Sequence, residues 1–185
     1  MIHNSLIEYK NIRLRQVQIE DLDKLRKWRN DSCNTKYLSR IPYITREMQL
    51  KWYEDYLNNN DEMMFAIDET KDLQRIVGSV SLYNFTDKQA EFGKILIGDS
   101  AAHHRKIGLN ALISLKCFAK EKLSLKKLYL HVYKENEAAL RIYHSAGFSV
   151  SNEYTINGKI EYVMENVLDV EDSLNLDEMV KINEK

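Results

Sequence analysis

Two polar side chains, Asn136 and Tyr143, share one stripe of a short predicted helix near the C-terminal end of the chain. The seven-residue spacing is nearly two helical turns, so both side chains point the same way, about 10 Å apart along the axis. Ala139 and Ala146 lie close to the same line, which makes this the buried face. Gly147 is expected to end the helix in the left-handed conformation. A polar pair on a buried stripe requires an explanation.

A second candidate is the loop that leads from a strand into a long predicted helix. Its side chains are mostly basic or able to donate hydrogen bonds: His103, His104, Arg105, Lys106, Ile107 and Gly108. The first amides of a helix have no partner within it and lie at the positive end of its dipole, so such a loop can bind a diphosphate group. A glycine here would let a phosphate approach the backbone closely.

Together these segments resemble the GCN5-related N-acetyltransferase (GNAT) superfamily, whose members move an acetyl group from acetyl-CoA to an amine. The late family pattern Asn-x-x-Ala-x-x-x-Tyr-x-x-x-Gly-Phe is matched at every position by Asn136, Ala139, Tyr143, Gly147 and Phe148. The resemblance spans residues 13 to about 166 and implies an acyltransferase that takes acetyl-CoA as co-substrate and needs no metal. Within the superfamily, the chain looks most like the ribosomal-protein and amino-sugar N-acetyltransferases.

The glycine-loop signature of the family, Arg/Gln-x-x-Gly-x-Gly/Ala, fits this chain in two registers. In one, Arg105 and Gly108 fill its first two positions and Asn110 replaces the last small residue. In the other, His103 fills the first position, Lys106 replaces the first glycine and Gly108 is the last. We prefer the second register, because it keeps a short link to the preceding strand. In both registers the backbone amides of the loop remain available to CoA.

Acetyl transfer to an amine needs a base, because an alkylamine is mostly protonated at neutral pH. Glu91, in a predicted strand, stands where many members of the family place a catalytic glutamate. We expect it to take the proton directly or through water; a merely solvated strand carboxylate is the alternative. His103 and His104 are alternative bases, or else loop residues that serve the phosphate or face solvent.

The resemblance also implies how the acetyl donor is held. The strand that ends at Leu96 and Ile97 would supply a backbone amide to the negative oxygen of the tetrahedral intermediate and follow the pantetheine arm. Tyr143 matches the general acid that protonates the departing thiolate, with a core tyrosine as the alternative. Asn136 would bind the cofactor, cap its own helix, or both. With Ala139, these residues complete the expected cofactor site, and no covalent enzyme intermediate is required.

The acceptor pocket of the family is built by the first two helices and their loop, here residues 28–52, facing the central strands. This region is rich in aromatic and amide side chains, which suit sugars and nucleotide bases. The candidates for contact with the acceptor are Asn30, Tyr37, Tyr43, Tyr83 and Asn84. We therefore expect a small-molecule amine, such as an amino sugar, free or linked to a nucleotide.

Other acceptors and one other class of function also fit the resemblance. Similar proteins include N-terminal acetyltransferases of ribosomal proteins and polyamine acetyltransferases. A polyamine enzyme should line its pocket with carboxylates, for which Glu47, Glu54 and Asp55 are candidates. A module of the same fold could instead bind acyl-CoA as a sensor without turnover. The incomplete glycine loop favours a sensor, whereas the presence of both Tyr143 and Glu91 argues for an enzyme.

The elements that must position these residues alternate between strands and helices. The predicted strands cover residues 13–17, 63–67, 76–83, 90–97 and 127–133, with two more near Phe148 and Ile160. The predicted helices cover residues 20–30, a segment capped by Thr45, residues 106 to 123, and the helix of Asn136 and Tyr143. This order predicts an α/β protein.

The fold class that the resemblance implies is the GNAT fold. Its sheet would be mixed and mostly antiparallel, with about six to seven strands, splayed between the fourth and fifth strands and flanked by about four helices. We expect residues 1–168 to form this single domain and residues 169–185 to be an acidic C-terminal tail.

Composition bounds the remaining possibilities. The chain has 185 residues, 44% of them hydrophobic, which is enough for the core of one domain. Its charges nearly cancel, to a net −1, which predicts no nucleic-acid or membrane partner. We read no signal peptide and expect a cytoplasmic protein. Cys33 and Cys117 match no metal or redox spacing and are expected to be buried free thiols. A homodimer is compatible with the family.

Overall fold

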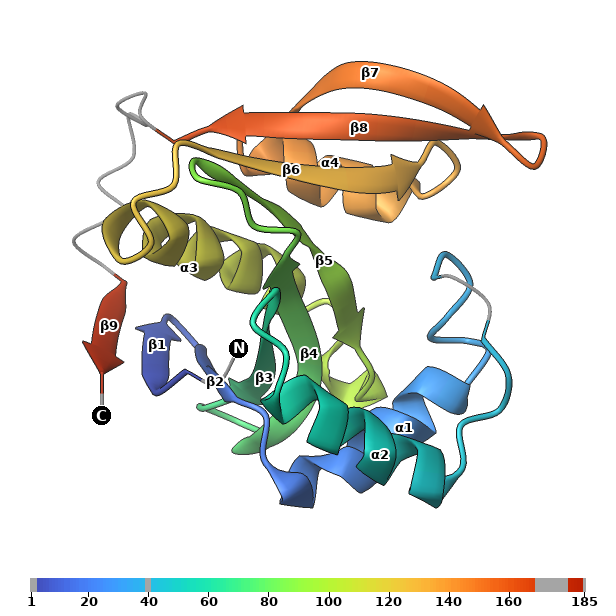
Figure 1. Cartoon of the computed structure of the whole chain (residues 1–185), viewed down its shortest axis with the longest axis vertical. Helices are drawn as coiled ribbons and strands as arrows, with labels where there is room; N and C mark the ends of the chain where they lie inside the picture. Colours follow the sequence, from blue (N-terminus) through green and yellow to red (C-terminus); the bar gives the residue numbers. More distant parts are fainter. Residues whose placement is uncertain (1–2, 39–40, 169–179, 185) are drawn as a thin grey trace.

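The computed structural model describes residues 3–38, 41–168 and 180–184, and this part of the chain contains nine strands and four α-helices (Figure 1). The strands are β1 (Ser5–Tyr9), β2 (Ile12–Gln16), β3 (Glu62–Glu69), β4 (Arg75–Tyr83), β5 (Gln89–Ile97), β6 (Lys127–Tyr133), β7 (Ser149–Ile156), β8 (Lys159–Val167) and β9 (Lys181–Glu184). The helices are α1 (Leu22–Asn30), α2 (Arg46–Leu57), α3 (Ile107–Glu121) and α4 (Glu137–Ser145), with short 3-10 turns η1 (Ile19–Asp21) and η2 (Ser100–Ala102).

All of these strands join one mixed sheet in the order β7-β8-β6-β5-β4-β3-β2-β1-β9. Every neighbouring pair is antiparallel except β5 and β6. Those two strands pair in parallel over three positions only, from Gln89 opposite Lys127 to Glu91 opposite Tyr129, and then diverge (Figure 1). The splay therefore lies between the fourth and fifth predicted strands, as expected, and the predicted fold class is confirmed.

The number of strands is larger than the predicted six to seven. β1 was not among the predicted strands, although its inward residues Ile7 and Tyr9 are fully buried. β9 lies within the segment expected to be an acidic tail, and it extends the sheet by pairing with β1 (Figure 1). Residues 169–179, which make up most of that segment, lie outside the described residues.

Helices cover both faces of the sheet, and the sequence of β3 shows how the two faces differ. Met63, Phe65 and Ile67 belong to the large core that includes α3. Their neighbours Met64 and Ala66 belong to a second core, formed with α1 and α2. Successive side chains of a strand point to opposite faces, so an uninterrupted apolar run is what a strand covered on both faces requires.

The helix that carries Tyr143 ends as the sequence predicts. Gly147 has a φ of +85°, in the left-handed region. Its amide donates to the carbonyl of His144, and the amide of Phe148 donates to the carbonyl of Tyr143, each at 3.0 Å. These are the two hydrogen bonds of a Schellman motif.

Two buried polar side chains complete the C-terminal end of α4. The ammonium of Lys116, on α3, donates to the carbonyl of Ala146 at 2.6 Å. The amide of Asn166, on β8, donates to the carbonyl of Gly147 at 2.7 Å. Both donors satisfy carbonyls that have no partner within the helix. The end of α4, and with it Tyr143, is therefore fixed to both α3 and the sheet.

Gly147→Ala is expected to lower the free energy of unfolding by about 1–2 kcal/mol, because an alanine there must adopt the left-handed conformation. Its Cβ would also lie 3.0 Å from Nδ2 of Asn166. Gly158→Ala is the matched control, since Gly158 has a φ of +76° and nothing within 4 Å of an added Cβ. Urea unfolding should show a larger loss at position 147 than at 158. Equal losses would mean that the contact with Asn166 has no effect.

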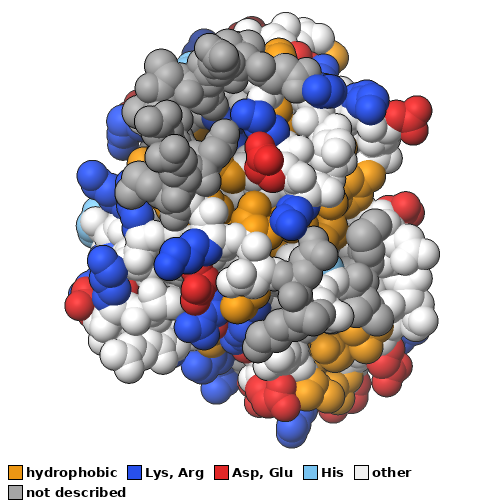
Figure 2. Space-filling model, turned by 90° about the vertical axis from the view of Figure 1, so that its left-hand side faces the viewer, with side chains coloured by type: hydrophobic (Ala, Val, Ile, Leu, Met, Phe, Trp, Pro, Cys, Tyr) orange, Lys and Arg blue, Asp and Glu red, His pale blue; other side chains and the backbone are white. Residues whose placement is uncertain are grey.

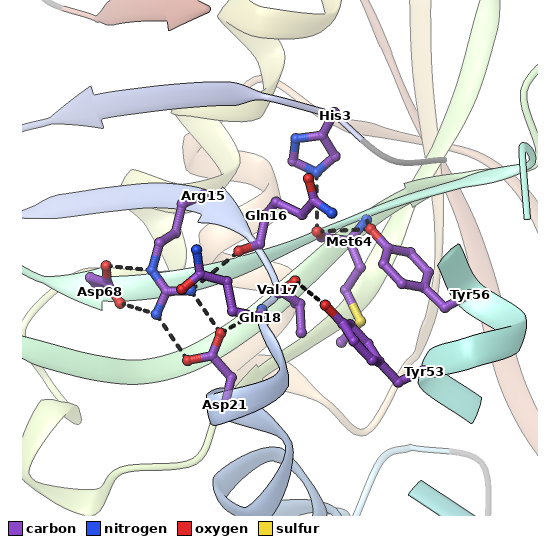
Figure 3. Close-up of polar contacts among 10 residues, drawn as sticks. All are labelled: His3, Arg15, Gln16, Val17, Gln18, Asp21, Tyr53, Tyr56, Met64 and Asp68. Carbon is purple, nitrogen blue, oxygen red and sulfur yellow. Dashed lines mark hydrogen bonds and ion pairs between the residues drawn. The ribbon is translucent and has the colours of Figure 1, made fainter. Parts of the chain in front are cut away.

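A charged network fixes the chain where β2 leads into α1 (Figure 3). The guanidinium of Arg15 donates to both oxygens of Asp21, at 2.7 and 2.9 Å, and to both oxygens of Asp68, at 2.9 and 3.1 Å. The hydrogen bonds to Asp21 are the main reason why the pKa of Arg15 is raised. Because the network joins β2, η1 and β3, it sets the direction in which α1 leaves the sheet.

A second group of side chains in Figure 3 forms hydrogen bonds with the start of β3, which extends beyond the end of β2. The ring of His3 donates to the carbonyl of Met64 at 3.2 Å. The hydroxyl of Tyr56, on α2, donates to the same carbonyl at 3.3 Å and accepts from the amide of Met64 at 3.1 Å. These contacts replace the missing strand neighbour, so α2 is attached to the first residues of β3.

His3 is expected to make folding sensitive to mild acid. Burial lowers the pKa of His3 from 6.5 to about 4. Between these two pH values, His3 is protonated in the unfolded chain but neutral in the folded chain. The contribution of His3 is therefore present above pH 6.5 and is lost as the pH falls towards 4, by up to about 3 kcal/mol. Urea unfolding at pH 7 and pH 4.5 should show a larger loss for the wild type than for His3→Phe. An equal loss in both proteins would contradict this role.

The surface and the cysteines bear on the remaining predictions. On the face shown in Figure 2, on the side of β9, Lys and Arg side chains are interspersed with Asp and Glu side chains. None of the described helices combines the length and the apolar character that crossing a membrane would require.

Cys117 is buried, but Cys33 is exposed. The prediction of a buried thiol is wrong for Cys33, because α1 ends at Asn30 and Cys33 lies in the loop that follows.

Candidate active site

A cleft of about 1130 Å³ is lined by residues of both β5 and β6, the strands that diverge. Its other walls come from α1, the α1–α2 loop, α2, β3, β4, α3, α4 and β8. Nine of the predicted site residues line it: Tyr37, Tyr83, Glu91, Leu96, Ile97, Gly108, Asn136, Ala139 and Tyr143. The structure thus brings the candidate base, the candidate acid and the end of β5 into one space.

Tyr143 lies on the inner face of α4 and is only 7% exposed. Its ring packs against Phe92 of β5 and Phe148, with centroids 6.2 and 6.3 Å away. Burial raises the pKa of Tyr143 to about 12. The hydroxyl is therefore protonated at neutral pH and can act as a proton donor to a group in the cleft.

Asn136 is the N-cap of α4 as well as a cleft residue. Its side-chain oxygen accepts from the amide of Ala139 at 3.3 Å. An asparagine side chain also carries an NH₂ group with two donor hydrogens. Capping the helix therefore leaves the NH₂ group of Asn136 as the part that can donate to a ligand, so the two expected roles are compatible.

Glu91 is 8% exposed, and two residues of β4 and its following turn hold its carboxylate. The hydroxyl of Tyr83 donates to one oxygen at 2.6 Å, and the amide of Asn84 donates to the other at 2.8 Å. Burial, followed by the hydrogen bond to Glu91, raises the pKa of Tyr83, which keeps it a donor. Tyr83 and Asn84 were predicted to contact the acceptor; the structure shows them orienting the candidate base.

The loop before α3 is braced by its own side chains. The ring of His103 donates to the carbonyl of Ile97 at 3.1 Å, which ties the loop to the end of β5. The guanidinium of Arg105 donates to the carbonyl of Ala101 at 2.8 Å and to the carboxylate of Asp72. His103, His104, Arg105 and Lys106 are exposed and do not line the cleft. The side chain of Ile107 is in the core, so only its backbone faces this loop.

The backbone of Lys106 agrees with the second register of the glycine-loop signature. Lys106 is the N-cap of α3 and has a φ of +59°, a conformation that favours glycine. The second register places the first glycine of the signature at this position. The amides that follow, including that of Gly108, are the first of α3 and have no partner within the helix.

Three residues predicted to contact the acceptor do not line the cleft: Asn84, which bonds Glu91, and also Asn30 and Tyr43. Asn30 uses both ends of its amide on Ile44, donating to its carbonyl and accepting from its amide, each at 2.9 Å. It therefore closes the α1–α2 loop. Tyr43 is 69% exposed, and its hydroxyl lies 3.5 Å from the guanidinium of Arg26.

The α1–α2 loop reaches across the cleft to the segment that precedes α4. The hydroxyl of Tyr37 donates to the carbonyl of Glu135 at 3.0 Å. Glu135 lies between β6 and α4 and directly precedes Asn136. This contact joins the α1–α2 loop to the segment that carries the cap of α4, and it closes one side of the cleft.

Several charged residues of the cleft were not predicted, and two of them, Glu62 and Lys94, form an ion pair. Glu62, the first residue of β3, is 8% exposed and accepts from the hydroxyl of Ser81 at 2.7 Å. Its other oxygen accepts from the ammonium of Lys94 at 2.7 Å. That ammonium also lies 4.6 Å from the centroid of the Tyr83 ring. Among the described residues, His, Cys, Asp and Glu form no cluster of three that could hold a metal ion.

Comparisons with known proteins identify the family of the chain. A profile of the acetyltransferase (GNAT) domain matches residues 11–149. The acetyltransferase PseH of Campylobacter jejuni is 24% identical over 148 residues, which cover 80% of this chain and 88% of that protein. The spermidine N(1)-acetyltransferase of Escherichia coli K12 is 28% identical over 153 residues, covering 80% of this chain and 81% of that protein.

Solved structures share the fold. Spermidine N-acetyltransferase from Vibrio cholerae, in complex with CoA and spermine, superposes with a TM-score of 0.77 at 22% identity and covers 85% of this chain and 96% of that chain. A GNAT-family acetyltransferase from Bacillus anthracis has a TM-score of 0.74 at 14% identity, with 88% and 98% covered. With the family profile matching most of its length, the chain belongs to the GNAT acetyltransferases and is an acyltransferase.

Proposed function

We propose that this protein transfers the acetyl group of acetyl-CoA to the primary amine of a small molecule by direct attack in a ternary complex. The observation that carries the proposal is the placement of Glu91 and Tyr143 on opposite sides of β5, within one cleft. Tyr143 packs against Phe92, and the neighbouring Glu91 points to the other face of the strand. An amine that enters from the side of Glu91 meets a thioester that lies on the side of Tyr143.

The proposed steps assign a role to each of these two side chains. Glu91 removes a proton from the ammonium of the acceptor, directly or through water, and the free amine attacks the thioester carbonyl. A backbone amide near Leu96 and Ile97 stabilises the negative oxygen of the tetrahedral intermediate. As the intermediate collapses, the carbon–sulfur bond breaks and Tyr143 donates its proton to the departing thiolate. The nitrogen releases its second proton to water, and Tyr143 and Glu91 return to their starting states by exchange with solvent. The products are the N-acetylated amine and CoA.

The remaining cleft residues and the glycine loop would hold the co-substrate. The backbone of Leu96 and Ile97 would follow the pantetheine arm, and the NH₂ group of Asn136 would donate to it, with Ala139 beside it. The diphosphate would be bound by the first amides of α3, where the positive end of the helix dipole adds to the attraction. The guanidinium of Arg105 is already bonded to Asp72, so the role of this side chain would be to hold the loop in place.

An amino sugar is the acceptor that the cleft supports best. Tyr37 and Tyr83 line it and offer aromatic faces and hydroxyl groups. The carboxylates considered for polyamine binding, Glu47, Glu54 and Asp55, are exposed and do not line it. A polyamine is the second candidate, because several similar proteins are spermidine acetyltransferases.

The test is thiol release from acetyl-CoA against a panel of amino sugars, polyamines and N-terminal peptides. We expect CoA to appear in proportion to acceptor, with an amino sugar giving the highest kcat/KM. Mass spectrometry of the product should show one added acetyl group on nitrogen. Tight binding of acetyl-CoA without transfer to any amine would overturn the proposal and favour an acyl-CoA sensor.

A further inference from the structure

We propose that Lys94 determines acceptor specificity: its ammonium neutralises Glu62 inside the cleft, so that the site takes an amine without a second cationic group in preference to a polyamine. This inference rests on the proposed function and concerns the same cleft. It is carried by the placement of Lys94 between a carboxylate and an aromatic ring that would otherwise bind a cation supplied by the acceptor.

Four residues form a row across adjacent strands of the sheet, and three of them, Glu62, Tyr83 and Glu91, line the cleft. Glu62 of β3 is opposite Tyr83 of β4, Tyr83 is opposite Glu91 of β5, and Glu91 is opposite Tyr129 of β6. Neighbouring strands are about 4.8 Å apart, so the backbones of Glu62 and Glu91 are about 10 Å apart. Two carboxylates on either side of an aromatic ring are suitable partners for two ammonium groups of one extended molecule.

In this protein, the ammonium of Lys94 occupies one of those two positions. The Nζ atom of Lys94 lies 2.7 Å from the carboxylate of Glu62 and 4.6 Å from the centroid of the Tyr83 ring. The backbone makes this possible: Lys94 has a φ of +50°, next to a bulge in the pairing of β4 with β5. The bulge brings the lysine side chain to the face that carries Glu91 and Tyr83.

The other carboxylates of the cleft also have partners within the protein. Among the described residues that line the cleft, the carboxylates are Glu62, Glu91 and Glu161. Glu91 accepts two hydrogen bonds, and Glu161 lies 3.2 Å from the ring of His131. The lining also includes the cationic side chains of Arg29 and Lys36. A polyamine would therefore meet several positive charges in this lining, and each of the three carboxylates of the lining already has a hydrogen-bonding partner.

Removing the Lys94 charge should open a polycation site. We expect Lys94→Met to bind spermidine on the order of tenfold more tightly than the wild type, as expected when one close charge is removed. Equilibrium dialysis with labelled spermidine measures this affinity without any turnover. Lys94→Arg keeps the charge and the same backbone strain and should resemble the wild type. In Glu62→Gln/Lys94→Met, which also lacks the carboxylate, the gain should disappear.

Turnover gives the second measurement. The ratio of kcat/KM for spermidine to kcat/KM for glucosamine should rise at least about tenfold in Lys94→Met and stay near the wild-type value in Lys94→Arg. The side chain of Lys94 is 50% exposed, so the variants should fold, which acetyl-CoA binding checks. An unchanged spermidine Kd in Lys94→Met, or a wild type that prefers spermidine, would overturn the role of Lys94. Absence of acetyl transfer by every variant would instead refute the proposed function.

Discussion

Tyr143→Phe is expected to lower kcat about 100-fold while the KM for acetyl-CoA stays near the wild-type value. The substitution removes one hydroxyl and keeps the ring, which packs against Phe92 and Phe148 in the core. Burial raises the pKa of Tyr143 to about 12, so the wild-type residue can donate a proton throughout the neutral range. Without it, the thiolate of CoA must leave unprotonated or take its proton from water.

The leaving group offers a sharper measurement of the same effect. A thioester whose thiol is much more acidic than that of CoA needs less help to depart, so the defect of Tyr143→Phe should shrink with such a donor. Tyr154→Phe is the matched control, since Tyr154 is 49% exposed on β7 and does not line the cleft. A defect that is the same for both donors would contradict the role of a general acid. A wild type without turnover would leave the sensor interpretation standing.

The α4 side of the cleft could be predicted because its signals are local. Asn136 caps α4, and Gly147 ends it with a left-handed residue. Both features depend on residues within one turn of the helix end, where the side chain and the backbone conformation of a single residue decide the structure. The spacing between Asn136 and Tyr143 then places both on the cleft.

The acceptor side was less predictable because its geometry depends on strand register. Strict alternation would place Lys94, three residues after Glu91, on the opposite face of β5. The bulge in β5 reverses this and brings Lys94 to Glu62. Likewise, the hydrogen bond from Tyr83 to Glu91 was not predicted, because it depends on the pairing of β4 with β5, which sets the two residues opposite each other. No pattern within a single segment specifies such partners.

The edge of the sheet shows the same limit at longer range. β9 pairs with β1, at the other end of the chain. A strand of four residues has too little alternation to be recognised alone, and its partner is distant in sequence. The same separation applies to Tyr37 and Glu135, whose hydrogen bond joins the two halves of the cleft. Contacts of this kind follow from the complete fold.

Glu91→Gln is expected to lower kcat/KM at pH 7 by about 100- to 1000-fold, because glutamine cannot take the proton of the acceptor ammonium. The change is nearly isosteric, and the amide oxygen can still accept from the hydroxyl of Tyr83, which bonds Glu91 at 2.6 Å. An alkylamine has a pKa of about 10.4, so more free amine is present as the pH rises. The defect should therefore decrease from pH 7 towards pH 10, and acetyl-CoA binding should not change. Glu165→Gln, which alters a carboxylate of β8 paired with Lys127 outside the cleft, is the control and should retain wild-type activity. A defect that stays constant across this pH range would mean that Glu91 positions the acceptor and that another group takes its proton.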